Sequence, residues 1–352
     1  MLSYDQVFSF DHAFFGMSRR ESEATDPAQR LVLRTCWQAL HLAGFERDEL
    51  DGKRIGVFVG AGPSEWSKAL GFKNALTGAG SAASLLANRV SYCFGLRGPS
   101  MVVDTACSSS LVALHLARQA IRHGECEAAV VCGVQVHLHP ATFEQVSRSK
   151  MVSPSNNRSK PFDASADGYG RGEGCGAVVL TKARNSLTSP LAVLKGTAIN
   201  QDGRSASLTA PSGPSQVEVI REALADAALQ PRDVAYVETH GTGTSLGDPI
   251  EFNALKSVFG PCSQQRREHP LALGAIKGQI GHLEAAAGMA SFIKAVLVLN
   301  HGGLLPPNVN FRRLNPAIVD SNDFSFVLPT RAQRLAPALH DKTIAPLLAA
   351  GV

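Results

Sequence analysis

A chain of 352 residues, 44% hydrophobic and 18% charged, has the composition of a folded globular protein, with length for a large core or two fused halves. Its formal net charge of +4 is spread along the sequence and gives no sign of a nucleic-acid surface. Seven cysteines without a CxxC pair argue against a disulfide framework or a thiolate zinc site, so we expect a reducing, cytoplasmic compartment. Neither a membrane-spanning apolar run nor a signal-peptide pattern is seen.

Apolar runs alternate with segments of helical periodicity along the chain. We expect helices at Asp26–Gly44, Ser81–Tyr92, Leu111–Gly124, Gln216–Leu229, Pro249–Phe259 and Glu284–Asn300. We expect strands at Arg54–Gly60, Ser100–Asp104, Ala128–Val136, Gly176–Leu180, Leu191–Asn200, Val234–Glu238 and Leu271–Ile276. This alternation predicts an α/β fold with mostly parallel sheets.

The segment Asp104-Thr-Ala-Cys107-Ser-Ser-Ser-Leu111 joins a strand end to a helix start. Cys107 is therefore expected at a helix N-terminus, among unpaired backbone N–H groups and at the positive end of the helix dipole. That position favours a thiolate nucleophile, and the same N–H groups can hold an oxyanion when the sulfur attacks a carbonyl. A lone cysteine before a helix is more often a small buried hydrophobe, so the catalytic interpretation needs support from other segments.

Two further turns carry a histidine beside glycine at a strand end. They are Val237-Glu-Thr-His240-Gly-Thr-Gly-Thr244 and Lys277-Gly-Gln-Ile-Gly-His282-Leu-Glu284. Catalytic groups gather at the carboxyl ends of strands in such folds. One cysteine and two neutral imidazoles suit acyl transfer, because the imidazole N–H groups can polarise a second thioester carbonyl and stabilise its enolate. A metal site is less favoured, since the histidines lack close helical spacing and no HExxH motif is present, and a Cys-His-Asn hydrolase would leave one histidine without a role.

The second half of the chain weakly repeats the first. The strand before Cys107 leads to a helix that stops at His123-Gly124, and the strand before His282 leads to a helix that stops at His301-Gly302. We therefore expect duplicated halves whose reactive turns meet at a pseudo-two-fold axis. Residues 1–185 would carry the cysteine, residues 186–330 would carry both histidines, and residues 331–352 would form an irregular tail.

Three blocks, taken together, resemble the signature blocks of β-ketoacyl synthases, most closely the ketosynthase domains of type I polyketide synthases and then the animal-type fatty acid synthases. They are Asp104–Leu111, Val237–Glu251 and Lys277–Ala290. Connecting segments match as well: Phe15–Ser18, Asp26–Arg30, Pro161–Gly176, Asn200–Gly203 and Pro211–Pro214. The resemblance runs from about Phe10 to about Asn315.

The resemblance implies a decarboxylative Claisen condensation in polyketide or fatty acid elongation. Cys107 would take the acyl chain from the phosphopantetheine thiol of an acyl carrier protein. His240 and His282 would promote decarboxylation of a malonyl-type thioester and stabilise the enolate, and Lys277 would support the His282 turn. No metal or bound cofactor is implied.

The resemblance also assigns supporting residues and a fold. Thr242 and Thr244 would hydrogen-bond the pantetheine arm, while Asp248 and Glu251 would brace the His240 loop, with helix capping as an equal alternative for Asp248. The implied fold is the thiolase type, a duplicated five-layer α/β/α/β/α homodimer. Acyltransferase and other polyketide synthase domains are further expected partners.

Two segments of the family pattern are expected to be missing. Ketosynthases begin with an Ile-Ala-Ile-Val-Gly-Met type strand and end in a glycine-rich strand and turn with a Gly-Phe-Gly-Gly pattern. We expect the chain to lack both and to be a truncated ketosynthase that needs flanking sequence for full activity, because that turn supplies a second oxyanion donor.

Two other classes stay open. One is a catalytically impaired or non-catalytic partner subunit with the same fold, of the chain-length-factor type, although such subunits usually lack the cysteine. The other is a thiolase or hydroxymethylglutaryl-CoA synthase acting on coenzyme A esters, which favours different residues beside the cysteine.

Overall fold

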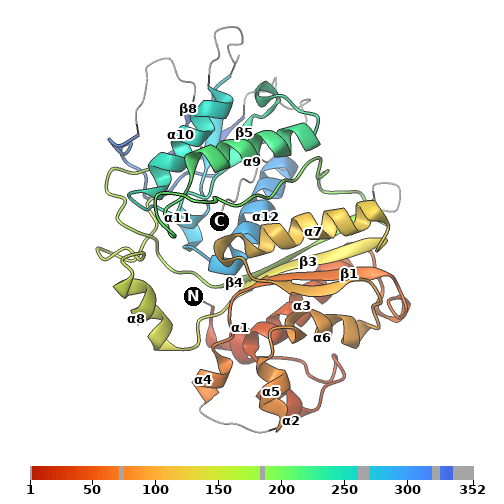
Figure 1. The fold of residues 1–352 in the computed structure, drawn as a ribbon. Coiled ribbons are helices and arrows are strands. Elements are labelled where there is room, and N and C mark those ends of the chain that lie inside the picture. The colour runs from red at the N-terminus through yellow and green to blue at the C-terminus, as the bar shows by residue number, and fades with distance from the viewer. Residues whose placement is uncertain (1, 71–74, 183–186, 261–268, 319–325, 336–352) are drawn as a thin grey trace. The chain divides into compact units, whose positions relative to one another are not determined.

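The computed structural model describes residues 2–70, 75–182, 187–260, 269–318 and 326–335 (Figure 1). Contacts divide the chain into two compact units that are interleaved in sequence. The first consists of Met1–Gln145, Gly172–Pro190 and Leu283–Met289, and the second of Val146–Arg171, Leu191–His282 and Ala290–Val352. The boundary expected between residues 185 and 186 lies outside the described residues.

The first unit is built on a four-stranded sheet in the order β2-β1-β3-β4. Its strands are β1 (Ile55–Ala61), β2 (Ser100–Val103), β3 (Ala128–Gln135) and β4 (Gly174–Thr181). β1 is parallel to β2 and β3, whereas β4 is antiparallel to β3. All residues of β1 are buried, as expected for a strand covered on both faces. The strands predicted here are confirmed, and the last of them reverses direction.

Helices cover both faces of this sheet. They are α3 (Pro27–Leu42), α6 (Leu85–Phe94) and α7 (Ser109–His123). α3 and α6 lie on one face and α7 on the other (Figure 1). α3 begins where predicted, because the Asp26 carboxylate accepts the Ala28 N–H at 2.7 Å and proline fills the first helical position. α7 ends as predicted at Gly124, whose left-handed backbone (φ 76°) closes the helix.

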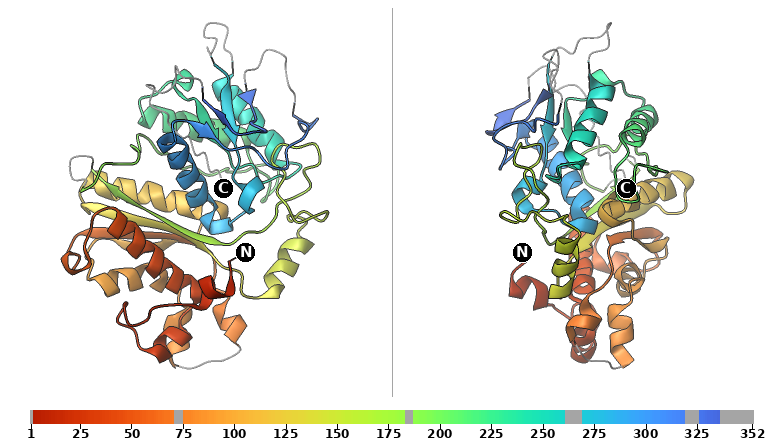
Figure 2. Two further views of the ribbon diagram at one scale, coloured as in Figure 1. Left: turned by 180° about the vertical axis from the view of Figure 1, so that it is seen from behind. Right: turned by 60° about the vertical axis from the view of Figure 1, so that its left-hand side comes forward.

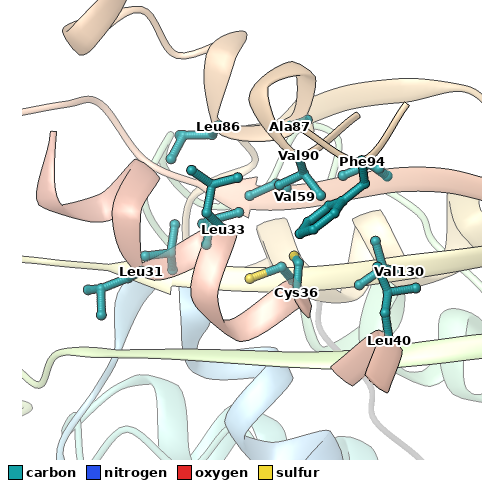
Figure 3. Close-up of a cluster of buried hydrophobic side chains, with 14 of the residues drawn as sticks. Leu31, Leu33, Cys36, Leu40, Val59, Leu86, Ala87, Val90, Phe94 and Val130 are labelled. Atoms are coloured by element: carbon teal, nitrogen blue, oxygen red, sulfur yellow. The ribbon is translucent and has the colours of Figure 1, made fainter. Parts of the chain in front are cut away.

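The core of the first unit lies between the sheet and helices α3 and α6 (Figure 3). Leu33, Cys36 and Leu40 follow the helical spacing of α3 and are fully buried. They belong to one cluster with Val59 of β1 and Val130 of β3. Burial stabilises each such aliphatic side chain by about 1.5–3 kcal/mol, so this stripe fixes α3 on the sheet.

The second unit contains a parallel sheet in the order β5-β6-β8. Its strands are β5 (Tyr236–Glu238), β6 (Leu271–Gly274) and β8 (Phe326–Val327). An antiparallel pair joins β7 (Leu304–Leu305) to β9 (Gln333–Arg334). The strands predicted near residues 236 and 271 are thus confirmed, with shorter bounds.

Side chains of β5 and β6 alternate between two helical layers. The helices are α9 (Gly213–Asp226), α10 (Gly247–Phe259) and α12 (Ala287–Asn300). Val237 and Leu273 share a buried cluster with α9 and α10, while Tyr236 and Ala272 share another with α12. The views from the front and from behind show these helices on opposite sides of the sheet (Figures 1 and 2). The period of two in the strands therefore decides which helix each side chain meets.

The remaining helices are short. They are α1 (Tyr4–Phe8), α2 (Arg19–Ala24), α4 (Trp66–Leu70), α5 (Ala75–Ser81), α8 (Pro140–Arg148) and α11 (Lys277–Ile280), with 3₁₀ turns at Arg47–Glu49, Ala106–Ser108, Pro231–Asp233 and Glu284–Ala286. Across the described ranges, no helix combines the length and apolar character needed to cross a membrane.

One predicted strand, Leu191–Asn200, is wrong. Its described residues pair with no other described strand, and its backbone bonds to side chains instead. Asn300 Nδ2 donates to the Leu191 carbonyl at 2.8 Å, and the Asp226 carboxylate accepts the Thr197 N–H at 2.9 Å. The apolar alternation is present, but a strand also needs a neighbouring edge.

Two other segments differ in detail. The helix predicted from Ser81 begins at Leu85, and the helix predicted from Glu284 opens with a 3₁₀ turn before α12. In the expected irregular tail, Gln333–Arg334 forms β9, and residues 336–352 lie outside the described residues.

Candidate active site

Hydroxyl groups hold the Cys107 turn in shape. Ala106 begins the 3₁₀ turn with a left-handed backbone (φ 55°), which costs a residue with a side chain about 1–2 kcal/mol. The Ser109 hydroxyl offsets that cost by accepting the Thr105 N–H at 2.9 Å and donating to the Ala106 carbonyl at 2.6 Å. The Ser108 hydroxyl donates to the Thr105 carbonyl at 2.9 Å. Cys107 is thus half-buried in a rigid turn at the start of α7.

The start of α7 packs closely on the sheet. A Cβ on Gly60 of β1 would lie 2.4 Å from the Ser110 nitrogen, and one on Gly133 of β3 would lie 2.8 Å from the Ser110 Cβ. Glycine at both strand positions therefore permits the approach. The Ser110 hydroxyl also accepts the Met289 N–H at 2.9 Å, so Leu283–Met289 packs at the same place within the first unit.

In the second unit, one carboxylate clamps the loop that carries His240. Glu251 of α10 accepts the His240 N–H at 2.6 Å through Oε1 and the Gly241 N–H at 2.8 Å through Oε2. Two backbone donors fix the orientation of the carboxylate and, through it, the start of the loop. The bracing role expected of Glu251 is confirmed.

Asp248 braces the next part of this loop. Its Oδ1 accepts the Gly243 N–H at 3.0 Å, and its Oδ2 accepts the Phe162 N–H at 2.6 Å. Burial raises the pKa of Asp248 to about 7, although these N–H groups favour the charged form. The Gly243 contact holds the loop, the Phe162 contact ties it to a second segment, and neither caps the first turn of α10, so the bracing interpretation is confirmed.

His282 lies beside His240 within the second unit. The ring centroids are 5.5 Å apart and the planes cross at 88°. The His282 N–H donates to the Gly170 carbonyl at 2.7 Å, and the Tyr169 ring packs edge-on with a centroid distance of 5.0 Å. Gly281 has a left-handed φ of 79°, and a Cβ there would come 3.0 Å from the Gly170 oxygen. Glycine before His282 therefore allows the two segments to meet.

Both imidazoles are neutral at pH 7. Burial and then the Lys277 cation lower the pKa of His240 to about 3. Burial, followed by the charges of Lys277, His240 and Arg171, holds the pKa of His282 well below its usual value. Lys277 itself is 2% exposed, at the start of α11. A neutral imidazole keeps one N–H donor, so this pair can donate to a substrate oxygen.

Thr242 and Thr244 follow His240 on the same loop. Their hydroxyl oxygens lie 3.2 Å apart, and Thr244 Oγ1 accepts the Gly247 N–H at 3.2 Å, at the start of α10. Thr242 is buried and Thr244 half-buried. The loop therefore fixes both hydroxyl groups, and their contact with a pantetheine arm stays a prediction.

The site residues predicted from the sequence divide between the two units. Cys107 belongs to the first unit. The second unit holds His240, Thr242, Thr244, Lys277 and His282.

The sequence interpretation missed Glu238, which is buried at the end of β5 and forms an ion pair with Lys294 at 2.8 Å. A signal was available, because Lys294 interrupts the apolar run of a helix and a buried cation needs an acidic partner. The carboxylate also sits only two residues before His240.

Two family models match the chain. "Beta-ketoacyl synthase, N-terminal domain" matches residues 2–186, and "Beta-ketoacyl synthase, C-terminal domain" matches residues 191–312. The chain belongs to the β-ketoacyl synthase family. In this β-ketoacyl synthase, the sequence had already pointed to the turn that carries Cys107 and to the turns that carry His240 and His282.

Similar proteins include polyketide synthases. The chain is 48% identical over 318 residues to the pikromycin polyketide synthase component PikAII of Streptomyces venezuelae, covering 88% of this chain and 8% of that protein. It is 46% identical over 308 residues to the polyketide synthase GfsA of Streptomyces halstedii, covering 85% of this chain and 4% of that protein. The β-ketoacyl synthase chain therefore spans a small part of each relative.

Solved ketosynthases share the fold. The ketosynthase from module 6 of the bacillaene synthase of Bacillus subtilis 168 superposes with a TM-score of 0.88 at 35% identity, covering 96% of this chain and 59% of that chain. The oxazolomycin ketosynthase domain OzmH KS7 of Streptomyces albus JA3453 gives a TM-score of 0.85 at 39% identity, covering 94% and 57%. The thiolase-type α/β fold predicted for this β-ketoacyl synthase is confirmed.

Proposed function

We propose that this β-ketoacyl synthase chain performs the decarboxylative Claisen condensation of polyketide chain elongation. The observation that carries the proposal is the pair of neutral imidazoles of half-buried His240 and fully buried His282, 5.5 Å apart between ring centroids in the second unit. Two neutral N–H donors suit an enolate oxygen, because they can stabilise its negative charge by hydrogen bonding without transferring a proton to it.

The Cys107 turn supplies the matching nucleophile. Cys107 lies directly before α7, where the positive end of the helix dipole stabilises negative charge, and the Ser109 hydrogen bonds hold the turn rigid. Leu283–Met289, which follows His282 directly in the sequence, packs against Ser110 within the first unit.

The reaction then has three steps. The Cys107 sulfur attacks the acyl thioester of the carrier, the bond from that carbonyl to the pantetheine sulfur breaks, and the leaving thiolate takes up a proton. A malonyl-type thioester loses CO₂, and the electron pair of the broken C–C bond forms an enolate whose oxygen accepts N–H bonds from His240 and His282. The enolate carbon attacks the Cys107 thioester, a C–C bond forms, and the Cys107 sulfur leaves as thiolate.

The setting of the reaction belongs to the same proposal. Substrates arrive on the phosphopantetheine of an acyl carrier protein, and Thr242 and Thr244 hydrogen-bond that arm. The two relatives described above are named as polyketide synthases, which favours a polyketide over a fatty acid product. A cytoplasmic homodimer that works with acyltransferase and other polyketide synthase domains completes the proposal.

Intact-protein mass spectrometry with an acyl thioester tests the first step. We expect a single acyl adduct that is lost in Cys107→Ala and kept in Cys93→Ala, a variant of another half-buried cysteine. Condensation with a malonyl thioester is expected to fall at least about 10²-fold in His240→Gln, because one enolate donor is removed. His301→Gln, which changes an exposed histidine, serves as the control. Adduct formation without any condensation in the unaltered chain would instead support the impaired partner subunit.

A further inference from the structure

One buried carboxylate in the second unit has no role in the reaction described so far. Glu238, at the end of β5, is 1% exposed and makes contacts with its own strand and with two other segments. Its Oε1 accepts the Ile276 N–H at 2.6 Å, and its Oε2 accepts from Lys294 Nζ at 2.8 Å. The Tyr236 hydroxyl donates to the same Oε2. Every oxygen of this carboxylate therefore has a donor in the protein.

Glu238 and its two partners outside β5 lie close in sequence to the proposed catalytic residues. Glu238 stands two residues before His240 on the same strand end. Ile276 immediately precedes Lys277, the cation that helps to keep both histidines neutral. Lys294 lies on α12, the helix that follows His282. One carboxylate thus joins the segments that carry the two imidazoles and their cation.

The physical chemistry of this pair favours a geometric role over a stabilising one. Removing both charges from water costs about as much as their mutual attraction returns, so a buried ion pair adds little net stability over a well-packed apolar pair. It does add directional bonds of fixed length, because both ions have defined donors or acceptors. A shift of about 1 Å in a reacting group can cost about 10²-fold in rate.

We propose that Glu238 and Lys294 are positioning residues that set the distance between the His240 loop and the Lys277–His282 turn. The Glu238 carboxylate ties the Ile276 amide to the end of β5, and Lys294 holds that carboxylate in place from α12. This inference rests on the proposed condensation. It predicts a selective defect: decarboxylation of the extender depends on the pair, and acylation of Cys107 does not.

Two double variants without buried charge isolate the acceptor at the Ile276 amide. In Glu238→Gln with Lys294→Met, the side-chain amide oxygen can still accept the Ile276 N–H. In Glu238→Met with Lys294→Met, the shape is kept and no acceptor remains. The full chain is assayed for release of CO₂ from a malonyl thioester and, separately, for acyl-adduct formation on Cys107, with Tm measured for every variant.

We expect decarboxylation to be about 10- to 100-fold slower in the Glu238→Met, Lys294→Met variant (the methionine pair) than in the Glu238→Gln, Lys294→Met variant. Acylation of Cys107 should stay within about three-fold of the unaltered chain in both double variants. Glu218→Gln, a carboxylate change on the exposed face of α9, should leave both rates unchanged. Equal decarboxylation in the two double variants overturns the proposal. A parallel fall in decarboxylation, acylation and Tm also overturns it, because a purely structural role affects all three.

If the methionine pair does not fold, Lys294→Met alone gives the second test. It removes the cation that holds the Glu238 carboxylate, so decarboxylation should fall while acylation persists, and unchanged decarboxylation overturns the proposal. Failure of the underlying condensation looks different, because the unaltered chain itself would then release no CO₂ from the malonyl thioester, with or without an adduct on Cys107.

Discussion

The Cys107 turn and the His282 turn follow the same backbone plan. Each comes after a short strand and enters a helix through a 3₁₀ turn, and each of these turns begins at a left-handed residue that is not glycine. Those residues are Ala106 (φ 55°) and Glu284 (φ 45°). Each helix is then followed by a left-handed glycine next to histidine, at Gly124 and Gly302. This agreement supports the duplication suggested by the sequence.

The two turns place their reactive side chains differently. Cys107 is inside the 3₁₀ turn, one residue after the left-handed position, where it is half-buried and close to the helix N–H groups. His282 stands two residues before the left-handed position and is 1% exposed. A nucleophile needs access and nearby N–H groups, whereas a hydrogen-bond donor for an enolate must stay neutral, which burial ensures. In the proposed reaction, one backbone plan thus serves two chemistries.

The most disruptive test removes only the nucleophile. Cys107→Ala should lower condensation by at least about 10³-fold, because no acyl enzyme forms. Decarboxylation of a malonyl thioester should stay within about ten-fold of the unaltered rate, since the histidine pair is untouched. Product analysis and CO₂ release measured on the same samples check this. Loss of both condensation and decarboxylation in Cys107→Ala would show that decarboxylation also depends on the Cys107 turn.

A second variant disturbs only the histidine side. Glu251→Gln leaves one acceptor oxygen for the two N–H groups of His240 and Gly241, so the loop should move. We expect CO₂ release to fall about 10²-fold and Cys107 acylation to remain unchanged. The exposed carboxylate variant Glu218→Gln controls for the change in net charge. A slower acylation of Cys107 in Glu251→Gln would show that the His240 loop also affects the acylation step.

The pH dependence of CO₂ release tests the depressed pKa values of the two histidines. The neutral imidazole is the active form, so the rate is kept above the histidine pKa and lost below it. With the pKa of His240 at about 3 and that of His282 also depressed, the rate of the unaltered chain should show no histidine-dependent loss between pH 8 and pH 5. Lys277→Met removes a cation that lowers both pKa values, so the acidic limb should move to higher pH. An acidic limb that stays in place would show that Lys277 does not act on the pair.

The smallest expected effect concerns the left-handed residue that begins the Cys107 turn. Ala106→Gly relieves the backbone cost at φ 55°, while glycine loses more conformational entropy on folding. The free energy of unfolding should therefore rise by no more than about 1 kcal/mol. The same exchange at Ala225, exposed in helix α9, should lower it by about 1 kcal/mol. Denaturant unfolding of both variants checks that the free energy of unfolding changes in opposite directions. A lower free energy of unfolding in Ala106→Gly would contradict a strained backbone at Ala106.

Local signals in the sequence predicted most elements and both kinds of turn. Asp26-Pro27 and Gly124 mark helix ends by capping rules that need no tertiary information. Leu191–Asn200 shows the opposite case, because its alternating pattern predicts a strand but pairing depends on a neighbour far away in sequence. The antiparallel direction of β4 could not be predicted from the sequence either, because a continuous apolar run is compatible with parallel and antiparallel pairing.

For this β-ketoacyl synthase, the sequence alone determined the family and the place of Cys107, His240 and His282 after strand ends. The tertiary structure decided what surrounds them: the Glu251 clamp, the burial that keeps both imidazoles neutral, and the Glu238–Lys294 pair that joins three segments. The physical reason is distance along the chain. Caps and turns depend on residues a few positions apart, whereas burial and ion pairing depend on side chains that only folding brings together.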